Sequence, residues 1–101
     1  MSTGESPKVS KSASAVVTIA NKLGLHARPA TLFAETASRS KAQITVRRCD
    51  QSQTVDGKSV IQMMLLAATA GTRIEISAKG SDADDAVATL VDLVKSGFQE
   101  D

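Results

Sequence analysis

The chain has 101 residues, which is enough for one domain with a single two-layer core but not for a separate substrate-binding domain. Twelve basic and eleven acidic residues give a formal net charge of +1, which removes the usual electrostatic case for binding nucleic acid or an anionic membrane. With two phenylalanines and no tyrosine or tryptophan, the chain also lacks a base-stacking platform, and its core must consist of aliphatic and small residues.

The cysteine content and the N-terminal composition narrow the class of protein further. Cys49 is the only cysteine, so an intramolecular disulfide cannot form, and the sequence shows no cluster of Cys or His with metal-ligand spacing. Residues 1–15 contain no continuous apolar run of the kind found in a signal peptide or membrane anchor. We therefore expect a cytoplasmic protein without a metal or a cofactor.

Residues 1–14 are predicted to form a flexible tail, because they carry five serines, a threonine, a glycine and a proline and have little to bury. The folded domain is expected to span residues 15–101. It begins with a partly buried strand from Ala15, in which Val17 and Ile19 recur with the period of two that is typical of a strand.

The only histidine lies where this strand is expected to pass through a turn into a helix. Residues 21–24 break the strand pattern, and a helix is predicted over about residues 27–38. Pro29 suits the first helical turn, because its φ is already helical and it has no N–H to satisfy. The N–H groups of such a turn and the helix dipole attract a phosphoryl group or another anion. His26 would lie at the mouth of this anion site, and the guanidinium of Arg28 would match phosphate oxygens.

Two short strands are expected to follow the first helix. The apolar side chains of that helix recur at helical spacing and comprise Ala30, Phe33, Ala34 and Ala37. Residues 42–48 alternate in polarity and predict a strand, residues 49–53 are polar and turn-like, and Thr54-Val55 resume a short strand. Asp56-Gly57 would end it in a tight turn. A hairpin is therefore expected here.

A second helix is predicted from Val60 to Gly71. Ser59 suits its N-cap, because the hydroxyl can accept a hydrogen bond from an N–H of the first turn, and Gly71 suits its end. One apolar stripe comprises Val60, Met63, Leu66 and Ala67, and the other comprises Ile61, Met64, Leu65 and Ala68. Since a small two-layer domain buries only one stripe, we expect Ile61, Met64 and their neighbours to stay exposed as a docking patch.

The remaining sequence predicts one more strand and one more helix. Residues 73–79 alternate again, and an acidic turn at Asp82 begins a helix that Lys95 and Gly97 would end. The apolar stripe of that helix comprises Ala83, Ala86, Val87, Leu90, Val91 and Val94. The order strand, helix, strand, strand, helix, strand, helix is typical of an α+β fold with its helices packed on one face of an antiparallel sheet.

This order of elements, the stretch NKLGLHARPA at residues 21–30 and the stretch GKSV at residues 57–60 closely resemble the HPr family of phosphocarrier proteins. The resemblance covers the chain from about Ala15 onward. It implies a two-layer open-faced sandwich in which a four-stranded antiparallel sheet carries three helices on one face.

The resemblance also implies a function. His26 would accept a phosphoryl group, on its pros nitrogen, from Enzyme I that has been phosphorylated by phosphoenolpyruvate, and would pass the group to a IIA-type protein. The protein would then be a carrier in a relay and not a turnover enzyme. By the same resemblance Arg28 would interact with the phosphoryl group, and the start of the second helix, with Val60, Ile61 and Met64, would contact the partners.

Ser59 matches the regulatory serine that a dedicated kinase/phosphorylase modifies in some bacteria, so a serine kinase is a further candidate partner. The sequence departs from the family in two ways: the stretch before Ser59 is slightly longer than in common sugar-branch carriers, and Gln62 replaces a small residue often found in kinase-regulated members. The ending at residues 96–101 and the NKLG start are similar to NPr, the nitrogen-branch relative. Both a sugar and a nitrogen phosphotransferase system therefore remain open.

Other interpretations of the same residues compete with phosphotransfer. Transfer needs a neutral imidazole nitrogen open to in-line attack and donors for three equatorial oxygens, which His26, Arg28 and the helix start would supply. The structural alternative is a histidine that merely caps a helix. A regulatory binding module, whose phosphorylation at His26 or Ser59 controls partner kinases or transcription regulators, is the rival function. A metal-dependent hydrolase is a third possibility, but the sequence offers almost no side chains that could bind its metal ion. Because docking to the partners would be transient, we expect the protein to be a monomer.

Overall fold

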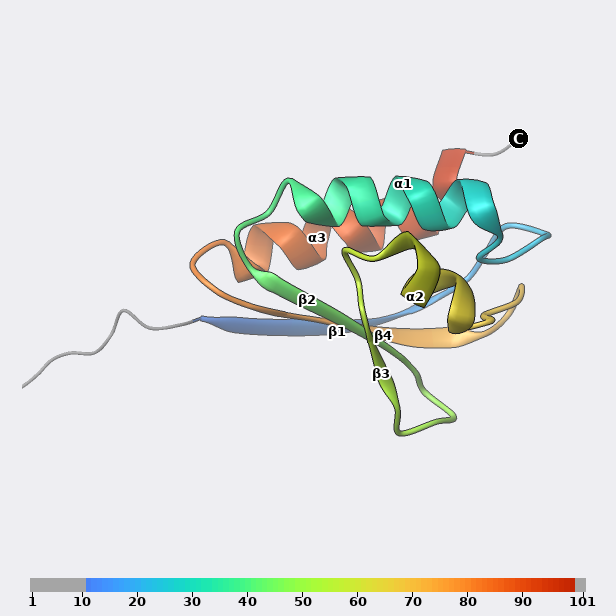
Figure 1. The fold of residues 1–101 in the computed structure, drawn as a ribbon, viewed down its shortest axis with the longest axis horizontal. Helices are drawn as coiled ribbons and strands as arrows, with labels where there is room; N and C mark the ends of the chain where they lie inside the picture. Colours follow the sequence, from blue (N-terminus) through green and yellow to red (C-terminus); the bar gives the residue numbers. More distant parts are fainter. Residues whose placement is uncertain (1–10, 100–101) are drawn as a thin grey trace, which may run out of the picture.

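The computed structural model describes residues 11–99, which form a sheet with helices packed on one side (Figure 1). In chain order the elements are β1 (Ser12–Thr18), α1 (Ala27–Ser38), β2 (Gln43–Arg48), β3 (Thr54–Asp56), α2 (Val60–Leu65), β4 (Arg73–Lys79), α3 (Ala83–Lys95) and the 3-10 turn η3 (Gly97–Gln99). The order of strands and helices is the one predicted from the sequence.

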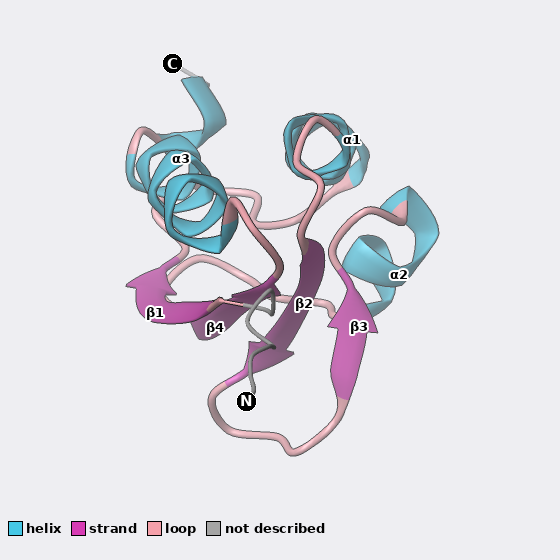
Figure 2. Ribbon diagram, turned by 90° about the vertical axis from the view of Figure 1, so that its left-hand side faces the viewer, coloured by secondary structure: helices cyan, strands magenta, loops and turns pink. Residues whose placement is uncertain are grey.

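The four strands form one antiparallel sheet in the order β1-β4-β2-β3, as Figure 2 shows with the helices above it. β4 lies inside the sheet because it pairs with β1 on one side and with β2 on the other. The hairpin expected between β2 and β3 is present. The predicted α+β fold, an open-faced sandwich with three helices, is confirmed.

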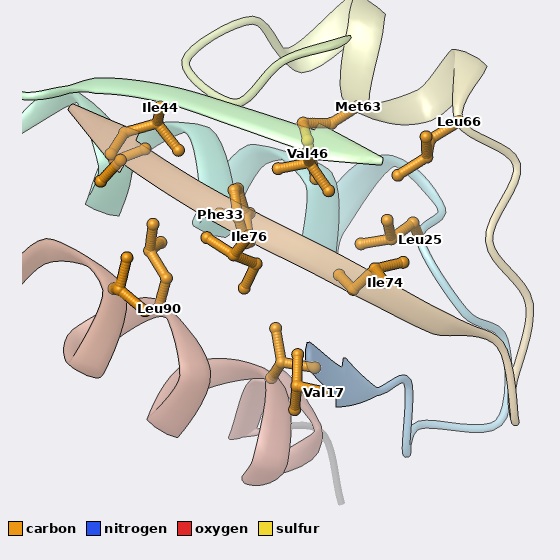
Figure 3. Close-up of a cluster of buried hydrophobic side chains, with 14 of the residues drawn as sticks. Val17, Leu25, Phe33, Ile44, Val46, Met63, Leu66, Ile74, Ile76 and Leu90 are labelled. Carbon is orange, nitrogen blue, oxygen red and sulfur yellow. The ribbon is translucent and has the colours of Figure 1, made fainter. Parts of the chain in front are cut away.

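The core lies between the sheet and the helices. Alternate residues of β2 and β4 point into it and are almost completely buried, namely Ile44, Val46, Ile74, Ile76 and Ala78. They meet Phe33 of α1 and Leu90 of α3, which are also buried (Figure 3). The period of two in the strands and the period of about 3.6 in the helices are therefore what bring these side chains together.

The first strand begins earlier than its sequence predicts. β1 pairs with β4 from Ser12, opposite Lys79, to Thr18, opposite Arg73, whereas the strand was expected from Ala15 and residues 12–14 were assigned to the tail. That boundary is wrong because the serines of β1 face solvent while its alanines pack against the core, so this strand needs only small apolar residues. The rest of the expected tail, residues 1–10, lies outside the described residues.

The second helix is shorter than predicted. α2 ends at Leu65, and Ala67 already has a φ of 55°, whereas the helix was expected to continue to Gly71. The backbone of the following segment bonds instead to the loop between β1 and α1: the Ala68 carbonyl accepts from the Leu25 N–H at 2.9 Å. Ala68 is consequently buried and Ala67 exposed, the reverse of the predicted stripes.

Candidate functional site

The loop that leads into α1 is held by buried polar contacts. Asn21 is 5% exposed, and its side-chain N–H donates to the Gly24 carbonyl at 2.8 Å. Gly24 has a φ of 67°, and a Cβ on it would overlap the carbonyl oxygen of Ala68 and lie 2.7 Å from the Cα of Thr69. Only glycine fits this position, because the backbone is both left-handed and closely approached. The start of α1 therefore has a fixed place beside the segment that follows α2.

His26 is the N-cap of α1. Its backbone is extended, with φ −78° and ψ −171°, and its carbonyl accepts the N–H of Ala30 at 3.0 Å. The imidazole is half-buried and does not cap the helix through a side-chain hydrogen bond. His26 thus caps α1 through its backbone, as the structural alternative expects, while the imidazole takes no part in the cap.

The first turn of α1 presents donors next to His26. Ala27 and Arg28 are the first two helical residues, so their N–H groups have no acceptor within the helix. Pro29 is the third helical residue and carries no N–H, and it is buried. Within residues 11–99 the guanidinium of Arg28 makes no hydrogen bond or ion pair, and Arg28 is exposed. Two backbone donors, one cationic side chain and the positive end of the dipole thus belong to the helical turn that begins at His26.

The C-terminal turn η3 lies against this helix start, a contact that no sequence pattern predicted. A surface hollow is lined by Ala27, Arg28, Thr31, Leu32, Phe98 and Gln99. Phe98 is buried although its φ is 59°. Sequence reasoning could place Gly97 at the end of α3, but a left-handed phenylalanine is too rare to be predicted from pattern.

Ser59 lies at the start of α2 as predicted. Its hydroxyl oxygen accepts from the Gln62 N–H at 3.2 Å, so the N-cap is confirmed. The side-chain oxygen of Gln62 in turn accepts from the Asp56 N–H at 2.9 Å. The Ser59 N–H also donates to the Asp56 carbonyl at 3.1 Å, so these bonds together tie the start of α2 to the end of β3.

An apolar surface is exposed on α2. Ile61 is 71% exposed, Met64 43% and Leu65 73%, whereas Met63 is completely buried and Val60 is half-buried. We refer to Ile61, Met64 and Leu65 as the α2 patch. Its exposure agrees with the prediction that one stripe of this helix stays outside the core. Leu23, which is 72% exposed in the loop before α1, is an apolar surface residue that the sequence analysis missed.

Arg48 is a further residue whose place could not be predicted. Its guanidinium donates to the Ala67 carbonyl at 3.1 Å and to both oxygens of Asp50, at 3.0 and 2.9 Å. The hydrogen bond from Arg48 lowers the pKa of Asp50. The end of β2 is thereby linked to the chain just after α2, where the helix stops.

Two further features bear on the class of site. Among residues 11–99, no three His, Cys, Asp or Glu side chains are grouped so that they could hold a metal ion. None of the helices in the same range is long and apolar enough to span a membrane.

Comparison with known proteins gives consistent matches. Residues 13–96 match the family model described as PTS HPr component phosphorylation site. The chain is 44% identical to phosphocarrier protein HPr of Pseudomonas aeruginosa, over 83% of this chain and 92% of that protein. It is 38% identical to phosphocarrier protein NPr of Escherichia coli, over 84% and 93%. The crystal structure of HPr-C-His from Thermoanaerobacter tengcongensis superposes with a TM-score of 0.82 at 40% identity, covering 88% of this chain and 98% of that one.

Proposed function

The chain belongs to the HPr family of phosphocarrier proteins of the phosphotransferase system, and from this premise we propose that His26 is the residue that carries the phosphoryl group. It would receive the group from phosphorylated Enzyme I, which is charged by phosphoenolpyruvate, and give it to a IIA-type protein. The observation that carries the proposal is the imidazole at the N-cap of α1, directly before two backbone donors and Arg28.

The transfer would proceed by in-line displacement. The lone pair of the neutral pros nitrogen (Nδ1) of His26 attacks the phosphorus while the bond from phosphorus to Enzyme I breaks, and Enzyme I keeps the electron pair. The phosphoryl oxygens remain negative throughout. The N–H groups of Ala27 and Arg28, together with the Arg28 guanidinium, would hold these oxygens. Attack by the IIA-type acceptor on the same phosphorus returns the lone pair to His26.

The α2 patch is the proposed docking surface for both partners. Apolar side chains that stay exposed beside a reactive residue can lose water when a partner binds, and methionine adapts to partners of different shape. The residues proposed to be contacted are Ile61 and Met64 of the patch together with Val60, which is half-buried and precedes them at the start of α2. A carrier that uses one patch for donor and acceptor must bind each only transiently, which fits a monomer that works in the cytoplasm.

Incubation with Enzyme I and labelled phosphoenolpyruvate tests the function. We expect the wild-type protein to take up acid-labile label, as phosphohistidine does, and the His26→Ala variant to take up none. A His26→Ala protein that still acquired acid-labile phosphate would contradict the proposal. The label should leave the carrier when a IIA-type protein is added, and the rates with sugar-branch and nitrogen-branch IIA proteins would assign the branch.

The regulatory module is the second candidate, favoured by the half-buried Ser59 hydroxyl beside the α2 patch. Phosphorylation of Ser59 by a serine kinase would add negative charge next to apolar docking residues and weaken docking. Acid-stable label from a kinase, absent in Ser59→Ala, would reveal this modification. Control of a partner by stoichiometric binding of the His26→Ala protein would favour the module over the carrier.

A further inference from the structure

Three consecutive residues at the end of the described chain adopt left-handed backbone conformations. The φ angles are 69° at Gly97, 59° at Phe98 and 61° at Gln99. Glycine accepts such a conformation without strain, but phenylalanine and glutamine do not. Runs of left-handed residues that are not glycine are rare, because each places Cβ too close to the backbone. The surrounding structure must therefore hold this turn in place.

Burial of one aromatic ring holds the turn. Phe98 is 1% exposed and belongs to the main hydrophobic core, whereas Gln99 is exposed. If α3 continued for another turn, residue 98 would lie further along the helix axis. The left-handed turn instead directs the ring of Phe98 back into the core. The N–H of Gln99 donates to the carbonyl of Ser96 at 3.3 Å and closes the turn.

The same turn lines a hollow with one of the chain segments that meet at His26 and lies close to the other. Phe98 and Gln99 line the hollow whose other side is formed by Ala27 and Arg28 of the first turn of α1. Gly97 faces the other segment: a Cβ placed on it would lie 3.8 Å from the Cβ of Asn21, the residue that holds the Gly24 turn. Figure 1 shows η3 at the end of the molecule where α1 begins.

We propose that Phe98 is a positioning residue for phosphoryl transfer, because the left-handed turn that it anchors fixes the loop before His26 relative to the donors after His26. This inference rests on the proposed function of His26. A shift between the two segments would change where the imidazole nitrogen lies relative to the N–H groups of Ala27 and Arg28, and phosphoryl transfer is sensitive to such displacements. Phe98 itself touches no reacting atom.

Phe98→Ala tests the proposal against a purely structural role, with Leu90→Ala as the matched control. Leu90 is also 1% exposed, but it lies in the middle of α3 and does not line the hollow. Both variants are to be assayed with Enzyme I at a temperature where circular dichroism shows each to be folded. In Phe98→Ala we expect kcat for phosphorylation to fall by about tenfold or more, with KM changed by less than about twofold. Leu90→Ala should retain both constants.

A second pair of variants covers the case in which Phe98→Ala does not fold. Gln99→Gly and Gln99→Val both remove the glutamine side chain, but glycine favours the left-handed backbone and the β-branched valine opposes it. We expect kcat of Gln99→Gly to exceed that of Gln99→Val by about fivefold or more if the turn positions the site.

Equal kcat values for the two Gln99 variants, or equal losses in Phe98→Ala and Leu90→Ala, would overturn the positioning role. In that event the wild-type and Leu90→Ala proteins would still be phosphorylated on His26, so the proposed function would stand. If neither of these took up label, the proposed function itself would have failed.

Discussion

At the scale of single residues, the chemistry proposed for His26 depends on which groups of its neighbours are available to an anion. The helix start leaves the N–H groups of Ala27 and Arg28 without intrahelical acceptors, while Pro29 contributes no donor. The guanidinium of Arg28 is the one cationic group in this first turn. Its role was predicted from sequence adjacency, and its exposure in the structure is compatible with that role.

We expect Arg28→Lys to lower the rate of His26 phosphorylation by about tenfold and Arg28→Ala to lower it by about a hundredfold, because lysine keeps the charge but loses the planar fork of donors. The rate of label uptake from Enzyme I measures this effect. Arg39→Lys is the matched control, since Arg39 is an exposed arginine at the opposite end of α1. If Arg28→Ala were phosphorylated at the same rate as the wild type, Arg28 would have no role in phosphoryl transfer.

At the scale of elements, α2 shows how a short helix can be both a structural and a docking element. The Ser59 cap and the Gln62 side chain fix its start, and Met63 anchors it in the core. Its end is set by neighbours, because the Ala68 carbonyl bonds to the Leu25 N–H and the Ala67 carbonyl to Arg48. The α2 patch is thereby kept on a segment whose two ends are tied to different parts of the fold.

We expect Ile61→Ser to raise KM for the carrier in the Enzyme I reaction by about tenfold, equivalent to roughly 1.4 kcal/mol of lost apolar contact, while kcat is retained. Steady-state kinetics at varied carrier concentration separate the two constants. Val16→Ser is the control: Val16 is 47% exposed, but it lies on β1 and alternates with Val17, which points into the core. A KM that rose equally in both variants would argue against docking on α2.

At the scale of the whole molecule, one carboxylate joins two turns that are distant in sequence. Asp82 accepts from the Ser40 hydroxyl at 2.9 Å and from the N–H groups of Lys41 and Ala42 at 3.0 and 2.9 Å. The turn after α1 is thus fastened to the turn before α3. Asp82 is the N-cap of α3, where the sequence predicted the helix to begin, but its carboxylate is directed to residues 40–42 and not to the first turn of the helix.

These contacts make the stability of the fold depend on pH. The backbone hydrogen bond from Lys41 and, after it, the hydrogen bond from the Ser40 hydroxyl lower the pKa of Asp82 below the ordinary value of an aspartate. A carboxyl group with a lower pKa in the folded state stabilises the fold above its unfolded pKa and loses this contribution as pH falls through the folded pKa.

We therefore expect Asp82→Asn to be less stable than the wild type at pH 7, and the difference in the free energy of unfolding to shrink between about pH 5 and pH 2. Urea unfolding at a series of pH values measures it. Asp84→Asn is the control, because Asp84 lies in the first turn of α3 but its carboxylate makes no hydrogen bond with the described residues. A difference between wild type and Asp82→Asn that stayed constant over this range would contradict the assignment.

The sequence by itself determined the class of fold, the order of its elements and the candidate histidine. Residues such as Ile74, Ile76 and Leu90 recur with the periods of strands and helices, and these periods are local properties of the chain. The position of Ser59 at an N-cap is equally local, since the bond it makes reaches only to Gln62.

Tertiary structure alone decided the features that depend on partners far away in the chain. β1 begins at Ser12 because β4 offers backbone partners there, and α2 ends at Leu65 because Leu25 and Arg48 bind the carbonyls that follow. Phe98 lies beside the start of α1 only because α3 leads the chain back over the sheet. Such contacts join residues many positions apart in the chain, so no local sequence pattern predicts them.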